Sequence, residues 1–157
     1  KQTNDKTLNK KINWIKGFKI LSLCLLVCGI LILCTPLFIY LFYKTKIKNK
    51  GKNQIAAIQR LIYFYLHQLN ALPSNEKSPN DMAQFIDNKF GTDMMVLNQL
   101  YQKCYYSKLS LTIEEENYIS QFHKTNFKRI TSKFSIKQKI LSFINIKNTI
   151  NYFNTIK

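Results

Sequence analysis

An uncharged run of 24 residues, Ile20 to Tyr43, constrains this chain more than any other feature. Its sequence is ILSLCLLVCGILILCTPLFIYLFY. A helix of about 20 apolar residues crosses a hydrocarbon core of ~30 Å. Lipid cannot form hydrogen bonds with backbone N–H and C=O groups, so a single span must satisfy them internally, as a helix does. The run therefore predicts a single transmembrane helix over residues 20–43. It is longer than the apolar region of a signal peptide, and no small-residue cleavage site follows it.

Basic residues flank the run on both sides. Residues 1–19 combine lysines with apolar positions and Trp14, and we expect an amphipathic juxtamembrane segment there. Residues 44–52 are expected to form a basic linker whose lysines determine the topology: Lys44, Lys46, Lys48, Lys50 and Lys52. The two flanks carry nearly equal charge, and the denser cluster after the run favours a cytoplasmic C-terminal domain.

Apolar residues spaced three and four apart predict that residues 53–157 form a small all-α domain of about four to five helices. Two capping boxes mark helix starts, Ser78 with Asp81 and Thr112 with Glu115, and Pro79 suits the first helical position. The expected helices cover residues 53–72, 79–90, 92–107 and 112–134, with the segment 135–157 as a candidate peripheral element.

The chain is strongly basic, with 24 lysines and arginines against 8 acidic residues. From Lys124 onward there is no acidic residue, and aromatic residues alternate with the cations. Such a segment is a solvated face in a lysine-rich sequence, a contact for anionic lipid, or a nucleic-acid surface. The membrane run favours lipid over nucleic acid. The candidate polyanion contacts are Lys124, Lys128, Arg129, Lys133, Lys137 and Lys139.

No catalytic constellation stands out. Cys104 falls on the apolar face of its expected helix, where an unreactive core thiol is the ordinary outcome. His67 and His123 have no metal-ligand spacing with other histidines or cysteines. Neither common type of phosphate-binding glycine loop is present. We therefore expect no catalytic residue, cofactor site or metal site in this chain.

Three short patterns follow one another between residues 55 and 110. A helical stretch runs from Arg60-Leu61 through Leu69, a proline-containing loop leads to Ser78-Pro79-Asn80-Asp81, and a leucine-rich helix carries Tyr101 and Tyr106. In this order they resemble the C-terminal domain of bacterial transglutaminase-like membrane proteins, the TgpA family. Tyr105 and Ser107 depart from that family's pattern, which has arginine and glycine at these places.

The resemblance implies that this chain is the last membrane span and helical tail of a bacterial inner-membrane protein. The chain begins with Lys-Gln-Thr rather than with methionine. We therefore expect a longer protein, and the resemblance implies that its Cys-His-Asp active site lies upstream of Lys1. The tail would act as a non-catalytic anchor and interaction domain, with a MoxR-type ATPase as the implied partner. Arg60, Tyr101 and Tyr106 are the candidate interaction surface. The alternative is a membrane-tethered basic module that binds anionic lipid or nucleic acid.

Overall fold

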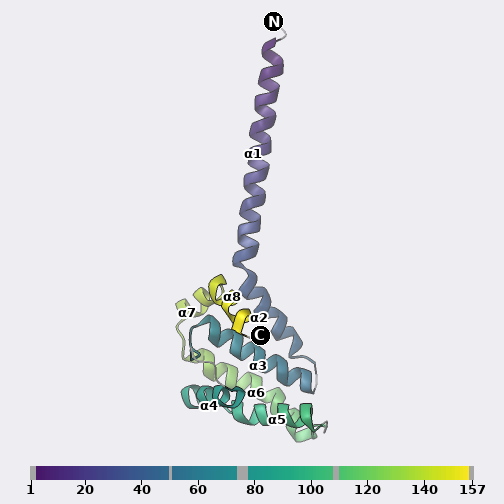
Figure 1. The fold of residues 1–157 in the computed structure, drawn as a ribbon, viewed down its shortest axis with the longest axis vertical. Coiled ribbons are helices and arrows are strands. Elements are labelled where there is room, and N and C mark those ends of the chain that lie inside the picture. Colours follow the sequence, from purple (N-terminus) through teal and green to yellow (C-terminus); the bar gives the residue numbers. More distant parts are fainter. Residues whose placement is uncertain (1–2, 50, 74–77, 108–109, 156–157) are drawn as a thin grey trace. The chain divides into compact units, whose positions relative to one another are not determined.

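The computed structural model describes residues 3–49, 51–73, 78–107 and 110–155, with side chains from residue 17 to residue 154 within these ranges. Every regular element in the described ranges is a helix, as the sequence predicts (Figure 1). They are α1 (Thr3–Leu33), α2 (Thr35–Lys46), α3 (Lys52–Gln68), α4 (Pro79–Phe90), α5 (Met94–Tyr106), α6 (Ile113–Ser132), α7 (Ile136–Ser142) and α8 (Ile146–Thr155). Lys50 and the side chains of the expected amphipathic segment up to residue 16 lie outside this description.

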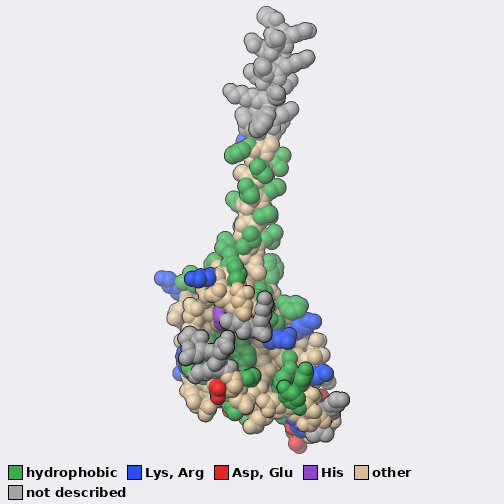
Figure 2. Space-filling view, viewed as in Figure 1, with side chains coloured by type: hydrophobic (Ala, Val, Ile, Leu, Met, Phe, Trp, Pro, Cys, Tyr) green, Lys and Arg blue, Asp and Glu red, His purple; other side chains and the backbone are tan. Residues whose placement is uncertain are grey.

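The chain divides into two compact units, residues 1–34 and residues 35–157. The first unit contains α1. Between Gly17 and Leu33 its described side chains are mostly apolar and almost all exposed, on every side of the helix. Figure 2 shows apolar side chains along the face of this helix that is in view. A helix that is apolar all round needs an apolar environment, either a protein core or lipid.

The uncharged run is not one helix, because α1 ends before Cys34 and α2 begins directly after it. Pro36 accounts for the break, since proline has no N–H to donate and its ring clashes with the preceding turn. Among the described residues no single helix has the length and hydropathy of a membrane span. Gly17–Leu33 and Thr35–Lys46 reach that measure only as a pair, by length and composition. The single transmembrane helix predicted over residues 20–43 is thus not confirmed.

Helix α3 lies at the centre of the second unit, where α2, α5, α6 and α8 contact it. Its buried residues surround most of its circumference, whereas a surface helix buries a single stripe. The apolar positions expected in this helix are confirmed as core. The largest fully buried side chains of this core include Ile55, Ile58, Ile62 and Leu66 from α3, Ile86 from α4, Met94 and Leu97 from α5, and Ile119 and Ile130 from α6.

Helix α2 packs one side against this core and leaves the other side open. The ring centroid of Tyr40 lies 5.2 Å from that of Phe143, 6.1 Å from that of Phe127 and 6.4 Å from that of Tyr65. Tyr40 therefore joins α2 to α3, α6 and the end of α7. The opposite side of α2 exposes Leu37, Phe38, Leu41 and Phe42.

The compact unit consequently begins at Thr35, whereas the sequence-based division starts the helical domain at residue 53. Lys44 and Lys46 belong to the last turn of α2, and Lys52 is the first residue of α3. The two ends of the expected basic linker are therefore helical, and residues 47–49 and 51 form the described part of the connection between α2 and α3. Hydropathy could not show this, because an apolar face packed on protein and one facing lipid have the same composition.

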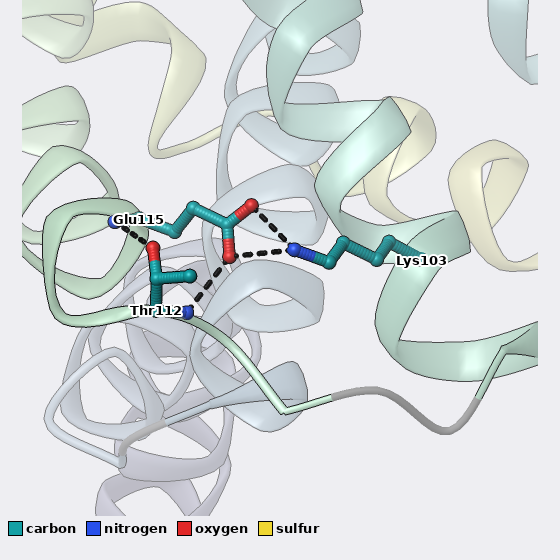
Figure 3. Close-up of polar contacts among 3 residues, drawn as sticks. All are labelled: Lys103, Thr112 and Glu115. Atoms are coloured by element: carbon teal, nitrogen blue, oxygen red, sulfur yellow. Dashed lines mark hydrogen bonds and ion pairs between the residues drawn. The ribbon is translucent and has the colours of Figure 1, made fainter.

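Helix α6 begins at a reciprocal cap (Figure 3). The N–H of Glu115 donates to Oγ1 of Thr112 at 3.2 Å, and the N–H of Thr112 donates to the Glu115 carboxylate at 2.8 Å. Lys103 on α5 donates to both carboxylate oxygens, at 2.7 and 2.9 Å. Ser78 and Asp81 form the same box at the start of α4. Both predicted capping boxes are confirmed.

The residue at the N-cap position of α5 does not supply its capping hydrogen bonds. Asp93 is the N-cap residue, but its side chain makes no capping hydrogen bond. Asp87, from the last turn of α4, accepts the N–H of Met94 at 2.6 Å and the N–H of Met95 at 2.9 Å. Its carboxylate also accepts the hydroxyl of Thr92 at 2.7 Å. The cap of α5 thus comes from the preceding helix.

The C-terminal segment forms two helices where one segment was expected. Ser135 accepts the N–H of Gln138, and the Gln138 side chain returns a bond to the N–H of Ser135, so a third capping box ends α6 and starts α7. Residues 143–145 then separate α7 from α8. In the described ranges after residue 50 there are therefore six helices, more than the four to five predicted.

These last helices pack on the end of α3. With its amide oriented to satisfy both groups, Gln68 donates to the carbonyls of Ser142 and Asn145 at 3.0 Å each and accepts the N–H of Thr149 at 3.2 Å. The Asn148 amide donates to the Gln68 carbonyl at 3.2 Å. The segment 135–157, a candidate peripheral element from sequence, is therefore held to the central helix by buried polar groups.

Candidate functional site

A pocket of about 510 Å³ opens in the second unit between α2, α3 and α5. This volume lies in the range of small-molecule sites. The lining is cationic, aromatic and small: Phe42, Tyr43, Lys46, Asn49, Lys52, Asn53, Ala56, Ala57, Arg60, Tyr101 and Tyr105.

One face of α3 forms much of the lining. Asn53, Ala56, Ala57 and Arg60 follow one another at spacings of three, one and three, so they lie on one side of the helix. The two alanines lie where larger side chains would fill the space. Gly51, at φ +73°, turns the chain into this helix, and no side chain caps its first turn among the described residues.

Two tyrosines from α5 supply the aromatic side. Tyr101 and Tyr105 are one helical turn apart, and their rings stack at 5.6 Å between centroids with planes 19° apart. Phe42 contributes a third ring from α2, and the Lys46 ammonium lies 5.3 Å from its centroid. The rings give the pocket flat apolar surfaces beside its charges.

The described lining of the pocket is positively charged. Lys46, Lys52 and Arg60 are its cations, and none of the described lining residues is acidic, although Lys52 also lines a neighbouring pocket with Glu116. The ion pairs found in the described part of the chain, Lys103–Glu115 and Arg129–Asp93, use other cations. Three cations that share one concave surface raise the local concentration of anions. The arrangement can therefore bind an anion, and its rings can accommodate an organic group attached to that anion.

The pocket brings together residues from two sets for which the sequence predicts different roles. Arg60 and Tyr101, from the candidate interaction surface, line the pocket together with Lys46 and Lys52 from the candidate topology cluster. Tyr106 does not line it. Its side chain is 75% exposed, and its ring packs edge-on against Tyr105, 5.0 Å away.

Of the remaining members of the lysine cluster, Lys44 and Lys48 are exposed outside the pocket, and Lys50 lies outside the described residues. Sequence reasoning missed Tyr105 and the two alanines of the pocket. The spacings Tyr101-x-x-x-Tyr105 and Asn53-x-x-Ala56-Ala57-x-x-Arg60, each of which places its residues on one side of a helix, could have indicated them.

The candidate polyanion contacts do not form one stripe. On α6, Lys124 and Lys128 lie on the outer side, whereas Arg129 is turned by roughly 140° from Lys124. The Arg129 guanidinium donates to the carbonyl of Gly91 at 2.7 Å, so it supports the α4–α5 turn. Lys133 caps the end of α6 through its backbone N–H, while on α7 Lys137 is exposed and Lys139 is half-buried.

Several apolar residues of the C-terminal segment face outward. The side chains of Ile136, Ile140 and Ile144 are exposed. Asn148 and Tyr152 occupy the buried side of α8 instead. The two helices therefore leave an apolar surface uncovered in this unit, and lysines 137, 139 and 147 belong to the same helices.

The side chains of His67, His123 and Cys104, which do not line the pocket, are partly buried. Burial lowers the pKa of His67 and of His123, and each ring packs against an aromatic neighbour. Burial and Glu115 raise the pKa of the Cys104 thiol, so it is protonated at neutral pH. In the part of the chain that the structure describes, no three His, Cys, Asp or Glu side chains are grouped to hold a metal ion.

In comparisons with known proteins, no family model, no curated protein and no solved structure matches this chain.

Proposed function

We propose that the chain is a membrane anchor joined to a non-catalytic helical interaction domain, the tail of a transglutaminase-like protein of the bacterial inner membrane. The observation that carries the anchor is α1, whose described side chains are mostly apolar and almost all exposed. Lipid supplies the apolar environment that this helix lacks in its own unit. The domain after Cys34 would then lie on the cytoplasmic side.

The span is proposed to be α1 rather than the whole uncharged run. One face of α2 packs on protein through Tyr40, so that helix is only partly available to lipid. The part of α1 from Trp14 to Leu33 has a length of about 30 Å, which matches the hydrocarbon core. Lys19, near one end, can extend its ammonium group to the headgroups.

Native cysteines test the anchor. In vesicles of phosphatidylcholine, Cys24 and Cys28 should stay unmodified by a water-soluble maleimide, because lipid surrounds them; in denaturant both should react. Ile113→Cys, at a position that is 80% exposed, is the matched control that must react when its side faces the reagent. Reaction of Cys24 and Cys28 in intact vesicles would contradict the proposal.

The interaction role is proposed for the domain surface that includes Arg60, Tyr101 and Tyr106, with a MoxR-type ATPase as partner by resemblance. Tyr106 is the sharpest test, since it is exposed and lies outside the pocket. Tyr106→Ala should weaken binding to such an ATPase measured with purified proteins. Tyr106→Phe keeps the ring and should bind normally. Equal binding by all three forms would count against this surface.

A second candidate function is binding of anionic lipid by α7, favoured by its exposed apolar residues next to basic ones. Ile140 and Leu141 are more than half exposed, and Lys137 lies one turn before Leu141. Such a helix suits the interface of an anionic bilayer. A fluorophore on Ile140→Cys should shift to the blue in vesicles containing phosphatidylglycerol, and one on Gln121→Cys of α6 should not. Matching spectra with and without the anionic lipid would exclude this candidate.

A further inference from the structure

We propose that the pocket between α2, α3 and α5 binds a phosphate ester, with the phosphate held by Lys46, Lys52 and Arg60 and the organic group against the tyrosines. The phosphate site is independent of the membrane proposal. Only a lipid source for the ester would rest on that proposal.

The cations carry the first step. Three positive side chains line one cavity, and no acidic residue is among its described lining residues. A dianionic group would form charge-assisted hydrogen bonds with them, and the arginine fork suits phosphate oxygens. Carboxylates satisfy the same rule more weakly, because they bring one charge to three cations.

The backbone position of Arg60 supports a built site. The hydroxyl of Tyr152 on α8 donates to the Arg60 carbonyl at 3.4 Å, and Ala57, one turn earlier, is 4% exposed. The α3 segment that bears the guanidinium is thus fixed by neighbouring helices. Its side chain is exposed and remains available to a ligand.

The size of the pocket and its aromatic rings support the second part of the proposal, that the phosphate bears an organic group. A cavity of about 510 Å³ is larger than inorganic phosphate needs, and much of its remaining wall is aromatic. The stacked pair Tyr101 and Tyr105 offers a flat surface to a planar or acyl group. On α2, Phe38, Phe42 and Lys46 follow at intervals of four, so one face changes from apolar to cationic towards the pocket. An ester with an apolar part and a phosphate head matches this order.

Two sources could supply this chemistry, a soluble phosphate ester or the headgroup of a phospholipid. The test measures the rate at which each lysine of the full chain, reconstituted in phosphatidylcholine nanodiscs, is acetylated by a trace of acetic anhydride. One arm adds phenyl phosphate, and the other replaces part of the lipid by phosphatidic acid. Lys124 and Lys128 on the outer side of α6 are internal controls.

At a ligand concentration ten times Kd, acetylation of Lys46 and Lys52 should slow about tenfold, because only the free protein reacts. The controls should change less than about twofold. Protection by phenyl phosphate identifies a soluble ester. Protection by phosphatidic acid alone identifies a lipid headgroup. No protection in either arm, or equal protection of the controls, overturns the phosphate site.

Arg60→Gln tests the same site without altering a labelled lysine. It should weaken binding about tenfold, which reduces the expected protection to about twofold. Lys124→Gln removes an equal charge elsewhere and should leave the protection intact. Tyr105→Leu, at an exposed position, gives a second variant that should weaken phenyl phosphate binding if Arg60→Gln fails to fold. Unchanged protection in folded Arg60→Gln would also overturn the site.

The maleimide experiment on Cys24 and Cys28 reports on the anchor alone. A shielded anchor with an unprotected pocket rejects the phosphate site and keeps the proposed function. A protected pocket with reactive anchor cysteines keeps the phosphate site and rejects the proposed anchor.

Discussion

Asp87→Ala should destabilise the second unit, because one carboxylate caps α5 from α4. It accepts the N–H groups of Met94 and Met95 at 2.6 and 2.9 Å, together with the hydroxyl of Thr92. Loss of a cap costs about 1–2 kcal/mol, and a hydrogen bond to a charged group contributes about 1.5–3 kcal/mol. Asp87 is half-buried, so water can replace part of this. We expect a loss of about 2 kcal/mol.

Thermal unfolding of the full chain in detergent, followed by circular dichroism at the helix band, measures this loss. A change of about 2 kcal/mol lowers Tm by about 8 °C in a unit of this size. Asp87→Asn, which retains one acceptor oxygen, should fall between the wild type and Asp87→Ala.

Asp93→Ala is the matched control. Asp93 is the N-cap residue by position, but its side chain makes no capping bond. Its carboxylate lies 4.0 Å from the guanidinium of Arg129, and both side chains are about half exposed, so the pair contributes about 0.5 kcal/mol or less. If Asp93→Ala proved as harmful as Asp87→Ala, or if Asp87→Ala left Tm unchanged, the assignment of the cap to Asp87 would be refuted.

Three further predictions concern other contacts. Tyr40→Ala removes the ring that joins α2 to its neighbours and should cost about 2 kcal/mol in urea unfolding, whereas Tyr40→Phe should cost little. Burial lowers the pKa of His67 and His123 below 6.5, so the unfolded chain binds their protons more readily. The contribution of the two neutral histidines to the free energy of unfolding should be fully present above about pH 6.5 and be lost as the pH falls through their lowered pKa values. Replacing both residues by Gln should make the free energy of unfolding depend less on pH in this range. Lys103→Met should raise the pKa of Glu115 towards its ordinary value, as a carboxyl NMR titration would show, because the hydrogen bond from the ammonium lowers it; an unchanged titration would speak against the contact.

Local signals in the sequence were sufficient for much of the fold. The capping boxes at Ser78 and Thr112 and the left-handed Gly91 that ends α4 act within one turn of the chain, so their residues can be recognised without the tertiary structure. Ser135 with Gln138 is the same kind of signal and would have separated α6 from α7.

Other features depend on residues distant in sequence or on the choice between two apolar environments. Gln68 reaches the α7–α8 turn from another helix, and no local rule indicates that contact. The outward direction of Ile140 likewise could not be predicted, because periodicity identifies an apolar face without saying what covers it. The pocket needed the fold, since Arg60 and Tyr101 meet only when α3 and α5 pack.

The difference between the packed and the exposed side of α2 has a consequence for the synthesis of the chain. Residues 35–43 leave the ribosome as part of a continuous apolar segment, before any of the helices that cover Tyr40 exist. If α1 is the membrane span that we propose, the insertion machinery would encounter a stretch that lipid can accept at once and that protein can accept only later. Correct folding would then require α2 to be released from, or held at the edge of, the bilayer until α3 is complete. A chain that commits these nine residues to lipid would be inserted normally and still lack one wall of its core.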